Sequence, residues 1–319
     1  MQQGDVMTMC TKPLWLVIGL TLSFQIQALA QETRPPIIDM HLHAQDLWAE
    51  PEQDAGDKFG PVFGQRTLGI PAAKSTEDLQ QQTLAAMDQY NIIMAVVSGP
   101  HAESYRSNQP LRIMASPLLY GVDEPVNSLR DAFNSGTYQA LAEFAPQYAG
   151  IAPNADELDP YFALAEELDI PVGIHMGLGP PGVAYLGRPN YRMALSNALL
   201  LEDVLVKHPD LRLYVMHAGW PLLDEMVGLM YAFPQVYVDI AVINWALPTK
   251  EFYAYLQRLV DAGYSKRIMY GSDQMVWPDA IGRAIETVES APFLSDEQRR
   301  DIMCRNAMTF LRLDETVCM

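Results

Sequence analysis

The chain has 319 residues, and 39 acidic residues against 21 basic ones give it a formal net charge of −18 at pH 7. This acidic balance disfavours nucleic acid and anionic membrane surfaces as partners, because both are themselves negatively charged. The length suits one large α/β barrel domain or two smaller domains.

The first thirty residues have the pattern of a secretory signal peptide. An apolar run from Leu14 to Phe24 follows a short polar start, and Ala28-Leu29-Ala30 matches an A-x-A cleavage site. The run is too short for a comfortable membrane span. We therefore expect residues 1–30 to be removed, Gln31 to begin the mature chain, and the protein to be exported, either to the periplasm or out of the cell, without a membrane anchor.

Two of the three cysteines, Cys304 and Cys318, lie in the predicted mature chain. An oxidising compartment would permit a disulfide between them, tying the C-terminal tail to the last helix. Two free thiols are the alternative, because the sequence does not give the distance between their Cα atoms.

Beyond residue 35, short apolar runs alternate with segments of helical periodicity. The predicted strands lie near 36–42, 93–98, 113–119, 139–144, 171–175, 211–216, 235–240 and 267–271. The predicted helices lie near 75–90, 123–134, 156–168, 191–207, 222–232, 249–262, 278–290 and 295–312, the last opened by a capping box of Ser295 and Gln298. The strands are rich in aliphatic residues, as expected for strands buried on both faces.

Eight strands alternating with helices predict a single (β/α)₈ TIM barrel over residues 31–319. A doubly wound open sheet is the alternative, but the sequence lacks the Gly-rich phosphate loop that this fold carries after its first strand. Two long connections, 44–74 and 176–190, follow strand C-termini, on the face where barrels build their active sites.

The first predicted strand ends in His41-Leu42-His43. Side chains alternate between the two faces of a strand, so both imidazoles point the same way and can bind one metal ion. Two unrelated histidines would give the same short pattern. The ends of three later strands favour the metal site.

His175 ends the fifth predicted strand, His217 ends the sixth, and Asp273 follows the eighth. In a barrel these positions converge on the axis from different directions. Imidazole nitrogens and carboxylate oxygens are the ligands that zinc and related divalent cations accept. A histidine at a single strand end is more often structural, but four such histidines and an aspartate are hard to obtain by chance.

This ordered pattern resembles the amidohydrolase superfamily, in particular its amidohydrolase-related metal-dependent hydrolases with TIM-barrel folds. The resemblance covers essentially the whole mature chain. It implies that His41, His43 and Asp273 bind the more buried metal position, and that His175 and His217 complete a second position or contact substrate. It also implies that a homodimer is common among such barrels.

One feature departs from the superfamily pattern. Many members carry a carboxylated lysine at the end of strand four, which bridges two metal ions, whereas this strand reads Ala140-Leu141-Ala142-Glu143-Phe144. Glu143 would supply the bridge, as a glutamate does in the TatD-like nucleases of the superfamily. A glutamate in an ion pair outside the site is the alternative, so both one ion and two ions stay open.

The resemblance also assigns catalytic roles. Asp273 is expected to accept a proton from a water activated by the metal and to pass it to the leaving group, and His217 to polarise the substrate oxygen. Asp39, one layer deeper on the face of His41, would orient a ligand or fill a polar position in the barrel. His208, between a helix and the next strand, lies on the opposite face and is expected to be structural.

Substrate contacts are predicted from position alone. The candidates follow strands on the catalytic face, where an arginine can clamp a carboxylate; they are His101, Tyr185, Arg188, Arg192 and Trp277. A solvated arginine paired with the acidic surface is the alternative for each arginine.

The sequence thus predicts an exported metal-dependent hydrolase that uses a metal-activated water on a small-molecule amide, ester or lactone. Zinc is the first expectation for the cofactor, as one ion or two, with manganese or iron as alternatives. The rival functions are a non-oxidative decarboxylase of the same superfamily and a catalytically silent exported binding protein on the same barrel.

Overall fold

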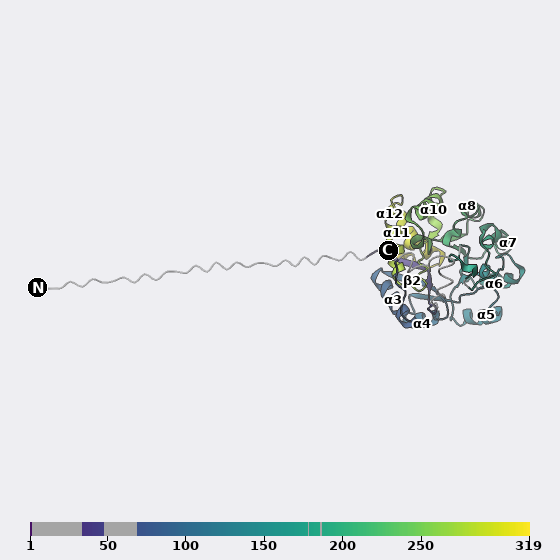
Figure 1. The fold of residues 1–319 in the computed structure, drawn as a ribbon, viewed down its shortest axis with the longest axis horizontal. Helices are drawn as coiled ribbons and strands as arrows, with labels where there is room; N and C mark the ends of the chain where they lie inside the picture. Colours follow the sequence, from purple (N-terminus) through teal and green to yellow (C-terminus); the bar gives the residue numbers. More distant parts are fainter. Residues whose placement is uncertain (2–33, 48–68, 178, 186) are drawn as a thin grey trace. The chain divides into compact units, whose positions relative to one another are not determined.

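The computed structural model describes Met1 and residues 34–47, 69–177, 179–185 and 187–319. The predicted signal peptide, Cys10 and most of the connection 44–74 lie outside the described residues. The compact unit spans Arg34–Met319, and in it the helices lie around the strands (Figure 1).

The described residues form eight strands, and every pairing between them is parallel. The strands are β1 (Ile37–His43), β2 (Ile92–Ser98), β3 (Ile113–Ser116), β4 (Leu141–Phe144), β5 (Val172–His175), β6 (Leu213–Met216), β7 (Tyr237–Asp239) and β8 (Ile268–Met269). Strands β1 to β3 pair in order as one sheet, and β4 to β8 pair in order as a second.

Backbone hydrogen bonds at the two junctions close these sheets into a barrel. Leu119, just after β3, pairs with Phe144 of β4 in a parallel bridge. On the other side, Met40 of β1 donates its N–H to the carbonyl of Tyr270 at 3.0 Å, directly after β8. The predicted TIM barrel is confirmed, and the register at the second junction sets β1 beside the segment that carries Asp273.

Helices connect the strands in the predicted alternation. They are α3 (Thr76–Gln89), α4 (Ala102–Asn108), α5 (Val126–Asn134), α6 (Asp159–Glu167), α7 (Glu202–Lys207), α8 (Leu223–Ala232), α9 (Ile243–Ala246), α10 (Thr249–Asp261), α11 (Asp279–Glu289), α12 (Asp296–Arg300) and α13 (Asn306–Phe310). The short helices α4 and α9 were not predicted. The capping box of Ser295 and Gln298 is confirmed at the start of α12.

Two predicted helices are interrupted. The prediction of one helix over 191–207 is wrong: Asn197 is extended, and its side chain accepts the N–H of Leu199, so 3₁₀ turns precede α7. Between α12 and α13 the chain makes a π-helical turn, Asp301–Arg305. The carbonyl of Ile302 in this turn accepts the N–H of Tyr270 at 2.8 Å, so the turn joins the C-terminal segment to the barrel.

The C-terminal segment closes the bottom of the barrel. Strand residues such as Met40, Tyr214 and Met269 form one buried cluster with Ala307 and Phe310 of α13. A disulfide joins Cys304 to Cys318 across a Cα–Cα distance of 5.9 Å and holds the last turn against this cluster. The opposite end, at the C-termini of the strands, is where polar side chains gather.

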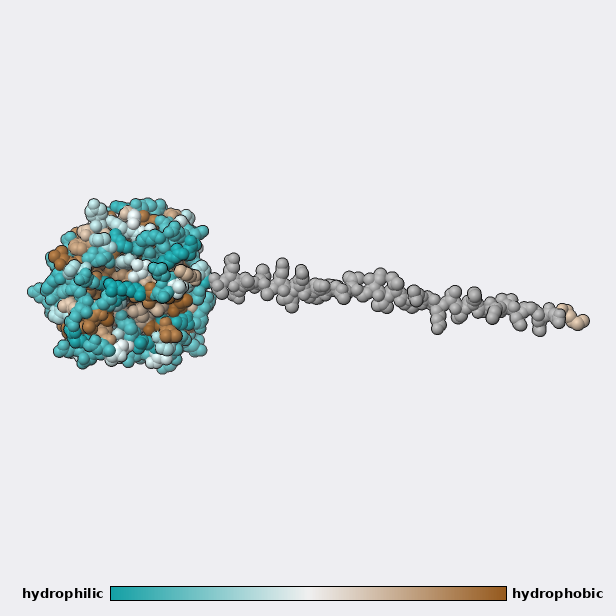
Figure 2. Space-filling view, turned by 180° about the vertical axis from the view of Figure 1, so that it is seen from behind, coloured by the Kyte–Doolittle hydropathy of each residue, from teal (hydrophilic) through white to brown (hydrophobic). Residues whose placement is uncertain are grey.

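The outer surface is mixed in character. Figure 2 shows hydrophilic residues over most of the face in view, with smaller hydrophobic areas among them. No helix among the described residues is both long enough and apolar enough to cross a bilayer.

Candidate metal centre

The H-x-H pattern forms one side of a buried cluster at the end of β1. The imidazole rings of His41 and His43 lie 5.1 Å apart between centroids, as expected for side chains on the same face of a strand. His43 Nε2 lies 2.9 Å and His41 Nε2 3.9 Å from Oδ1 of Asp273, which follows β8. The N–H of Asp273 bonds the carbonyl of His41 at 2.7 Å, so the register of the barrel sets this group.

The other side of the cluster comes from the middle strands. His175 ends β5, His217 directly follows β6, and their rings lie 4.5 Å apart. The His41 ring lies 5.1 Å from that of His217 and so joins the two sides. A Cβ at Gly177 would lie 2.6 Å from Cδ2 of His217, so this position needs glycine for β5 to approach the ring.

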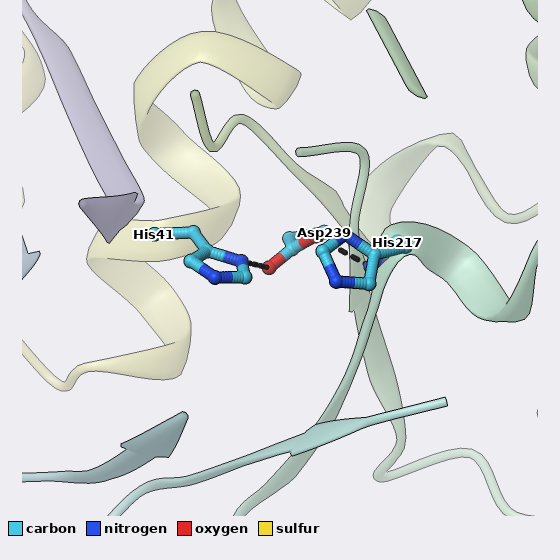
Figure 3. Close-up of side chains that lie close together, drawn as sticks. All are labelled: His41, His217 and Asp239. Carbon is cyan, nitrogen blue, oxygen red and sulfur yellow. Dashed lines mark hydrogen bonds and ion pairs between the residues drawn. The ribbon is translucent and has the colours of Figure 1, made fainter. Parts of the chain in front are cut away.

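Two of the four imidazoles are oriented by acceptors outside the cluster. His41 Nδ1 lies 3.1 Å from Oδ2 of Asp239 and donates its proton there, because a carboxylate can only accept (Figure 3). His217 Nδ1 donates to the carbonyl of Ala241 at 3.0 Å. In both rings Nε2 is therefore the nitrogen that is available to bind a metal.

The other two imidazoles are held in the same manner. His43 Nδ1 contacts Oγ of Ser98 at 3.0 Å, and His175 Nδ1 contacts the side-chain amide of Gln147. In His43 and His175, as in the other two rings, the Nδ1 side is held by the surrounding protein.

Glu143 lies between the two sides. Its Oε2 is 3.5 Å from His43 Nε2 and 3.8 Å from His41 Nε2, whereas its Oε1 is 3.5 Å from His175 Nε2. The two oxygens therefore face different sides of the cluster. The alternative prediction, that Glu143 forms an ion pair outside the site, is therefore wrong.

The electrostatics of Glu143 and His175 suit the protonation states that a cation requires, whereas His41 differs. Burial alone would lower the pKa of His41, but Asp273, Asp239 and Glu143 raise it well above its usual range, so a cation at His41 would displace a proton. Burial alone would raise the pKa of Glu143, but the surrounding histidines, His175 foremost, bring it well below its usual range, so the carboxylate is ionised. Burial, and then the neighbouring His217, lower the pKa of His175 to about 3, so this imidazole is neutral. An ionised carboxylate and a neutral imidazole are both ready to bind metal.

Two buried atoms in the cluster lack hydrogen-bond partners. They are His41 Nε2 and Asp273 Oδ1, the latter close to His43 but not aligned with it for a hydrogen bond. Leaving such an atom unsatisfied costs about 1–3 kcal/mol. A divalent cation would satisfy both atoms. Three sets of side chains have donor atoms close enough to hold one: His41, His43 and Asp273; Glu143, His175 and His217; and His41, His217 and Asp239. The residues present therefore fit a metal.

Asp239, which ends β7, is a positioning residue rather than a ligand. Its Oδ2 accepts from His41, and its Oδ1 accepts the N–H groups of His217 at 2.8 Å and Ala241 at 3.0 Å (Figure 3). Both oxygens thus already accept hydrogen bonds, although Asp239 also lies close enough to His41 and His217 to share a metal with them. The sequence analysis did not single out Asp239, although a polar residue ending an apolar run is the same signal that found His175 and His217.

The backbone at two of these residues is strained. His217 has φ of 57° and Asp273 has φ of 48°, a left-handed conformation that costs a non-glycine residue about 1–2 kcal/mol. Such outliers concentrate at functional sites, where surrounding structure holds them in place. Gln274 supplies part of that support, because its side chain bonds both the N–H and the carbonyl of His43.

The structure places two of the predicted substrate residues near the catalytic end of the barrel. Arg188 lies with its guanidinium carbon 3.9 Å from the ring centroid of Tyr120. His101, at the start of α4, hydrogen-bonds Asp46 at 2.8 Å through a side chain that is 36% exposed.

The other three candidates lie in different settings. Arg192 is exposed and donates to the carbonyls of Pro189 and Tyr191 in its own loop. Trp277 is buried in the core and packs edge-on against Trp245. Tyr185 is 69% exposed.

Asp39 lies buried behind His41, and His208 lies on the helical side of the barrel, as the sequence predicted. Asp39 accepts the N–H groups of His41 and Ser272 with Oδ1, and burial raises its pKa to about 7. His208 bonds Glu166 and Asp159 on the helical side of the barrel, which is the structural role predicted for it.

Gln147 and Tyr148, in the turn after β4, also reach the cluster, and no sequence signal marks them. Their segment reads as an ordinary loop, and only the fold brings it against His175.

Asp239→Asn is expected to lower metal affinity about 10- to 100-fold, because an amide presents a poorer acceptor to His41 Nδ1. Metal affinity by competition with a chromophoric chelator checks this, with thermal unfolding as a test of folding. Asp261→Asn, at the exposed end of α10, makes the same chemical change away from the cluster. Equal affinity in the wild type and Asp239→Asn would contradict the positioning role.

Comparison with solved structures identifies relatives of the fold. An uncharacterised TIM-barrel protein from Bordetella bronchiseptica is 17% identical with a TM-score of 0.65, over 87% of this chain and 98% of its own. A dihydroxybenzoic acid decarboxylase from Polaromonas sp. JS666, with manganese and an inhibitor bound, is 14% identical with a TM-score of 0.57, over 87% and 97%. A probable 2-pyrone-4,6-dicarboxylic acid hydrolase from Acinetobacter baumannii is 14% identical with a TM-score of 0.57, over 87% and 99%.

No curated protein sequence matches the chain. A family model described as amidohydrolase matches residues 38–313, from the second residue of β1 to beyond α13. This span contains all six side chains of the cluster and confirms the resemblance found in the sequence. The chain belongs to the amidohydrolase family.

Proposed function

We propose that the protein is a metal-dependent hydrolase that acts on a small-molecule amide, ester or lactone. The observation that carries the proposal is the convergence of four imidazoles and two carboxylates in one buried cluster, with His41 Nε2 and Asp273 Oδ1 left without partners. The metal ligands would be His41, His43, Glu143, His175, His217 and Asp273. Zinc is the first expectation for imidazole and carboxylate ligands, and manganese or iron suits the same set.

A divalent cation held there would supply Lewis acidity, which polarises a substrate oxygen and makes water a better nucleophile. The residues of the chain then manage the proton. With Oδ1 on the cation, Asp273 would use its other carboxylate oxygen to accept the proton of the attacking water. It would then return this proton to the leaving group. Because Nδ1 of His217 bonds the carbonyl of Ala241, its Nε2 is the nitrogen available to the substrate. Where no metal is bound to this nitrogen, it would orient the substrate oxygen.

The second candidate is a non-oxidative decarboxylase. Relatives of the fold include the manganese-bound dihydroxybenzoic acid decarboxylase as well as the probable 2-pyrone-4,6-dicarboxylic acid hydrolase, so both reactions occur on closely similar barrels. We favour hydrolysis because Asp273 lies in the cluster, where a carboxylate is suited to take a proton from water. A catalytically silent binding protein would retain the metal and show no turnover.

The purified protein is expected to hydrolyse at least one compound in a panel of esters, lactones and amides, and to lose this activity when metal is removed by a chelator. Asp273→Asn should lower kcat about 10²- to 10⁴-fold, because it removes the proton acceptor. Asp261→Asn is the control. Loss of carbon dioxide from aromatic acids, with no hydrolysis in the panel, would instead establish the decarboxylase.

We further propose that Glu143 bridges two metal ions, because its two oxygens face the two sides of the cluster. Metal analysis of the wild type is expected to give two ions per chain, and Glu143→Ala one or none. Glu103→Ala, on the exposed side of α4, should leave the count unchanged. One ion in both the wild type and Glu143→Ala would refute the bridge.

Export is also a proposal. The apolar run and A-x-A site support it, as does the Cys304–Cys318 disulfide, since such bonds persist mainly in oxidising compartments. The homodimer stays a prediction from the resemblance. A small molecule as the only partner of the protein also stays a prediction.

The full-length chain with its natural N-terminus is expected to be recovered from the periplasm or the medium with Gln31 as its first residue. Intact-mass measurement of the recovered protein checks this. Recovery from the cytoplasm with residues 1–30 retained would contradict it.

A further inference from the structure

Two peptide units directly precede the carboxylate of Asp273, and each is held by hydrogen bonds at both of its ends. One joins Gly271 to Ser272, and the other joins Ser272 to Asp273, in the buried segment that follows β8. Because a peptide unit is planar, holding its carbonyl and its N–H together fixes its orientation.

Strand β1 holds the N–H ends of both units. The N–H of Ser272 donates to Oδ1 of Asp39 at 3.0 Å, and the N–H of Asp273 donates to the carbonyl of His41 at 2.7 Å. Both acceptors lie in the strand that carries the H-x-H pattern. These bonds set the segment after β8 against β1, and the carbonyl ends point to a different element.

Helix α9 holds the carbonyl ends. The side-chain amide of Asn244 donates to the carbonyl of Gly271 at 2.9 Å, and the indole N–H of Trp245 donates to the carbonyl of Ser272 at 2.6 Å. The N–H of Val242 adds a longer bond to the carbonyl of Ser272, at 3.3 Å. Asn244 and Trp245 are each 1% exposed, so their side chains take the place of water as donors to buried carbonyls.

The backbone conformation of Asp273 depends on these bonds. Its φ of 48° is the rotation that relates the Ser272–Asp273 peptide unit to the Cα atom that carries the carboxylate. A non-glycine residue keeps such a left-handed conformation only where the surrounding structure holds it. If the peptide unit were released, the carboxylate would leave its position 2.9 Å from His43 Nε2.

The chain just before α9 reaches two more of the candidate ligands. The carbonyl of Ala241 accepts from His217 Nδ1 at 3.0 Å. Asp239, two residues earlier, accepts from His41 Nδ1 at 3.1 Å. The segment 239–245 therefore supports side chains that come from β1, from the end of β6 and from the segment after β8.

We propose that helix α9 acts as a clamp that fixes the carboxylate of Asp273 for metal binding, with Asn244 and Trp245 as its positioning residues. Each acts through one backbone carbonyl, and together they hold both peptide units that lead to Asp273. The use of this orientation for a metal rests on the proposed function, whereas the clamp on the backbone does not.

The competing explanation is that Trp245 only fills the core, where its ring packs edge-on against Trp277 at 6.1 Å between centroids. That role predicts a loss of stability on substitution, without a specific effect at Asp273. The clamp predicts an effect that is transmitted through Asp273 and is seen in protein that is fully folded.

The first experiment uses Trp245→Phe, which keeps an aromatic ring and removes the N–H donor. It is expected to lower metal affinity about 10- to 100-fold, as loss of a group that orients a ligand does. Affinity is measured by competition with a chromophoric chelator, at a temperature where thermal unfolding shows the protein to be folded. Should Trp245→Phe fail to fold, Asn244→Leu, which removes the other donor, carries the same test.

A matched control and a double variant separate the two explanations. Trp220→Phe also loses an indole N–H, but its 3.4 Å bond goes to Glu251 on α10, so metal affinity should change less than about twofold. In an Asp273→Ala background there is no carboxylate left to orient, and Trp245→Phe should again change affinity less than about twofold.

A crystal structure of Trp245→Phe gives a readout that needs no metal. We expect Asp273 to leave its left-handed conformation and its carboxylate to move away from His43. Asp273 unchanged in that crystal would overturn the clamp. A displaced Asp273 in a protein that binds no metal would sustain the clamp and refute the proposed hydrolase, so the two failures can be told apart.

The affinities give further outcomes that contradict the clamp. It is overturned if Trp245→Phe binds metal as tightly as the wild type, or if Trp220→Phe loses as much affinity. It is also overturned if the effects of Trp245→Phe and Asp273→Ala multiply in full, because the tryptophan would then act independently of the carboxylate.

Discussion

The burial of two carboxylates and four imidazoles within one small space is the constraint on which the rest of the structure depends. Polar groups removed from water must be satisfied by partners, and in this cluster His41 Nε2 and Asp273 Oδ1 have none. The Nδ1 atoms are held by Asp239, Ser98, Gln147 and a backbone carbonyl. What is left pointing inward is a set of lone pairs that a cation would complete.

The barrel fold brings these side chains together at one end of the sheet. Its parallel strands deliver side chains from five places in the sequence to one end, and the C-terminal segment closes the other end with apolar residues and a disulfide.

The sequence predicted much of this arrangement because the residues concerned interrupt apolar runs. His41, His43, His175 and Asp273 each stand at a strand end, and the rule that such ends converge in a barrel was enough to group them. Glu143 could be placed only as one of two alternatives, since its strand carries no other polar residue to fix its direction. Gln147 and Tyr148 lie in a turn whose position depends on tertiary packing, so no local pattern marked them.

The account is tested most directly by anomalous X-ray diffraction from crystals of the metal-analysed protein, recorded at the absorption edge of the metal found. It predicts a strong peak within the group formed by His41, His43 and Asp273, with a second peak on the other side of Glu143. Full-occupancy metal located elsewhere, or no peak among these side chains in a catalytically active crystal form, would contradict it.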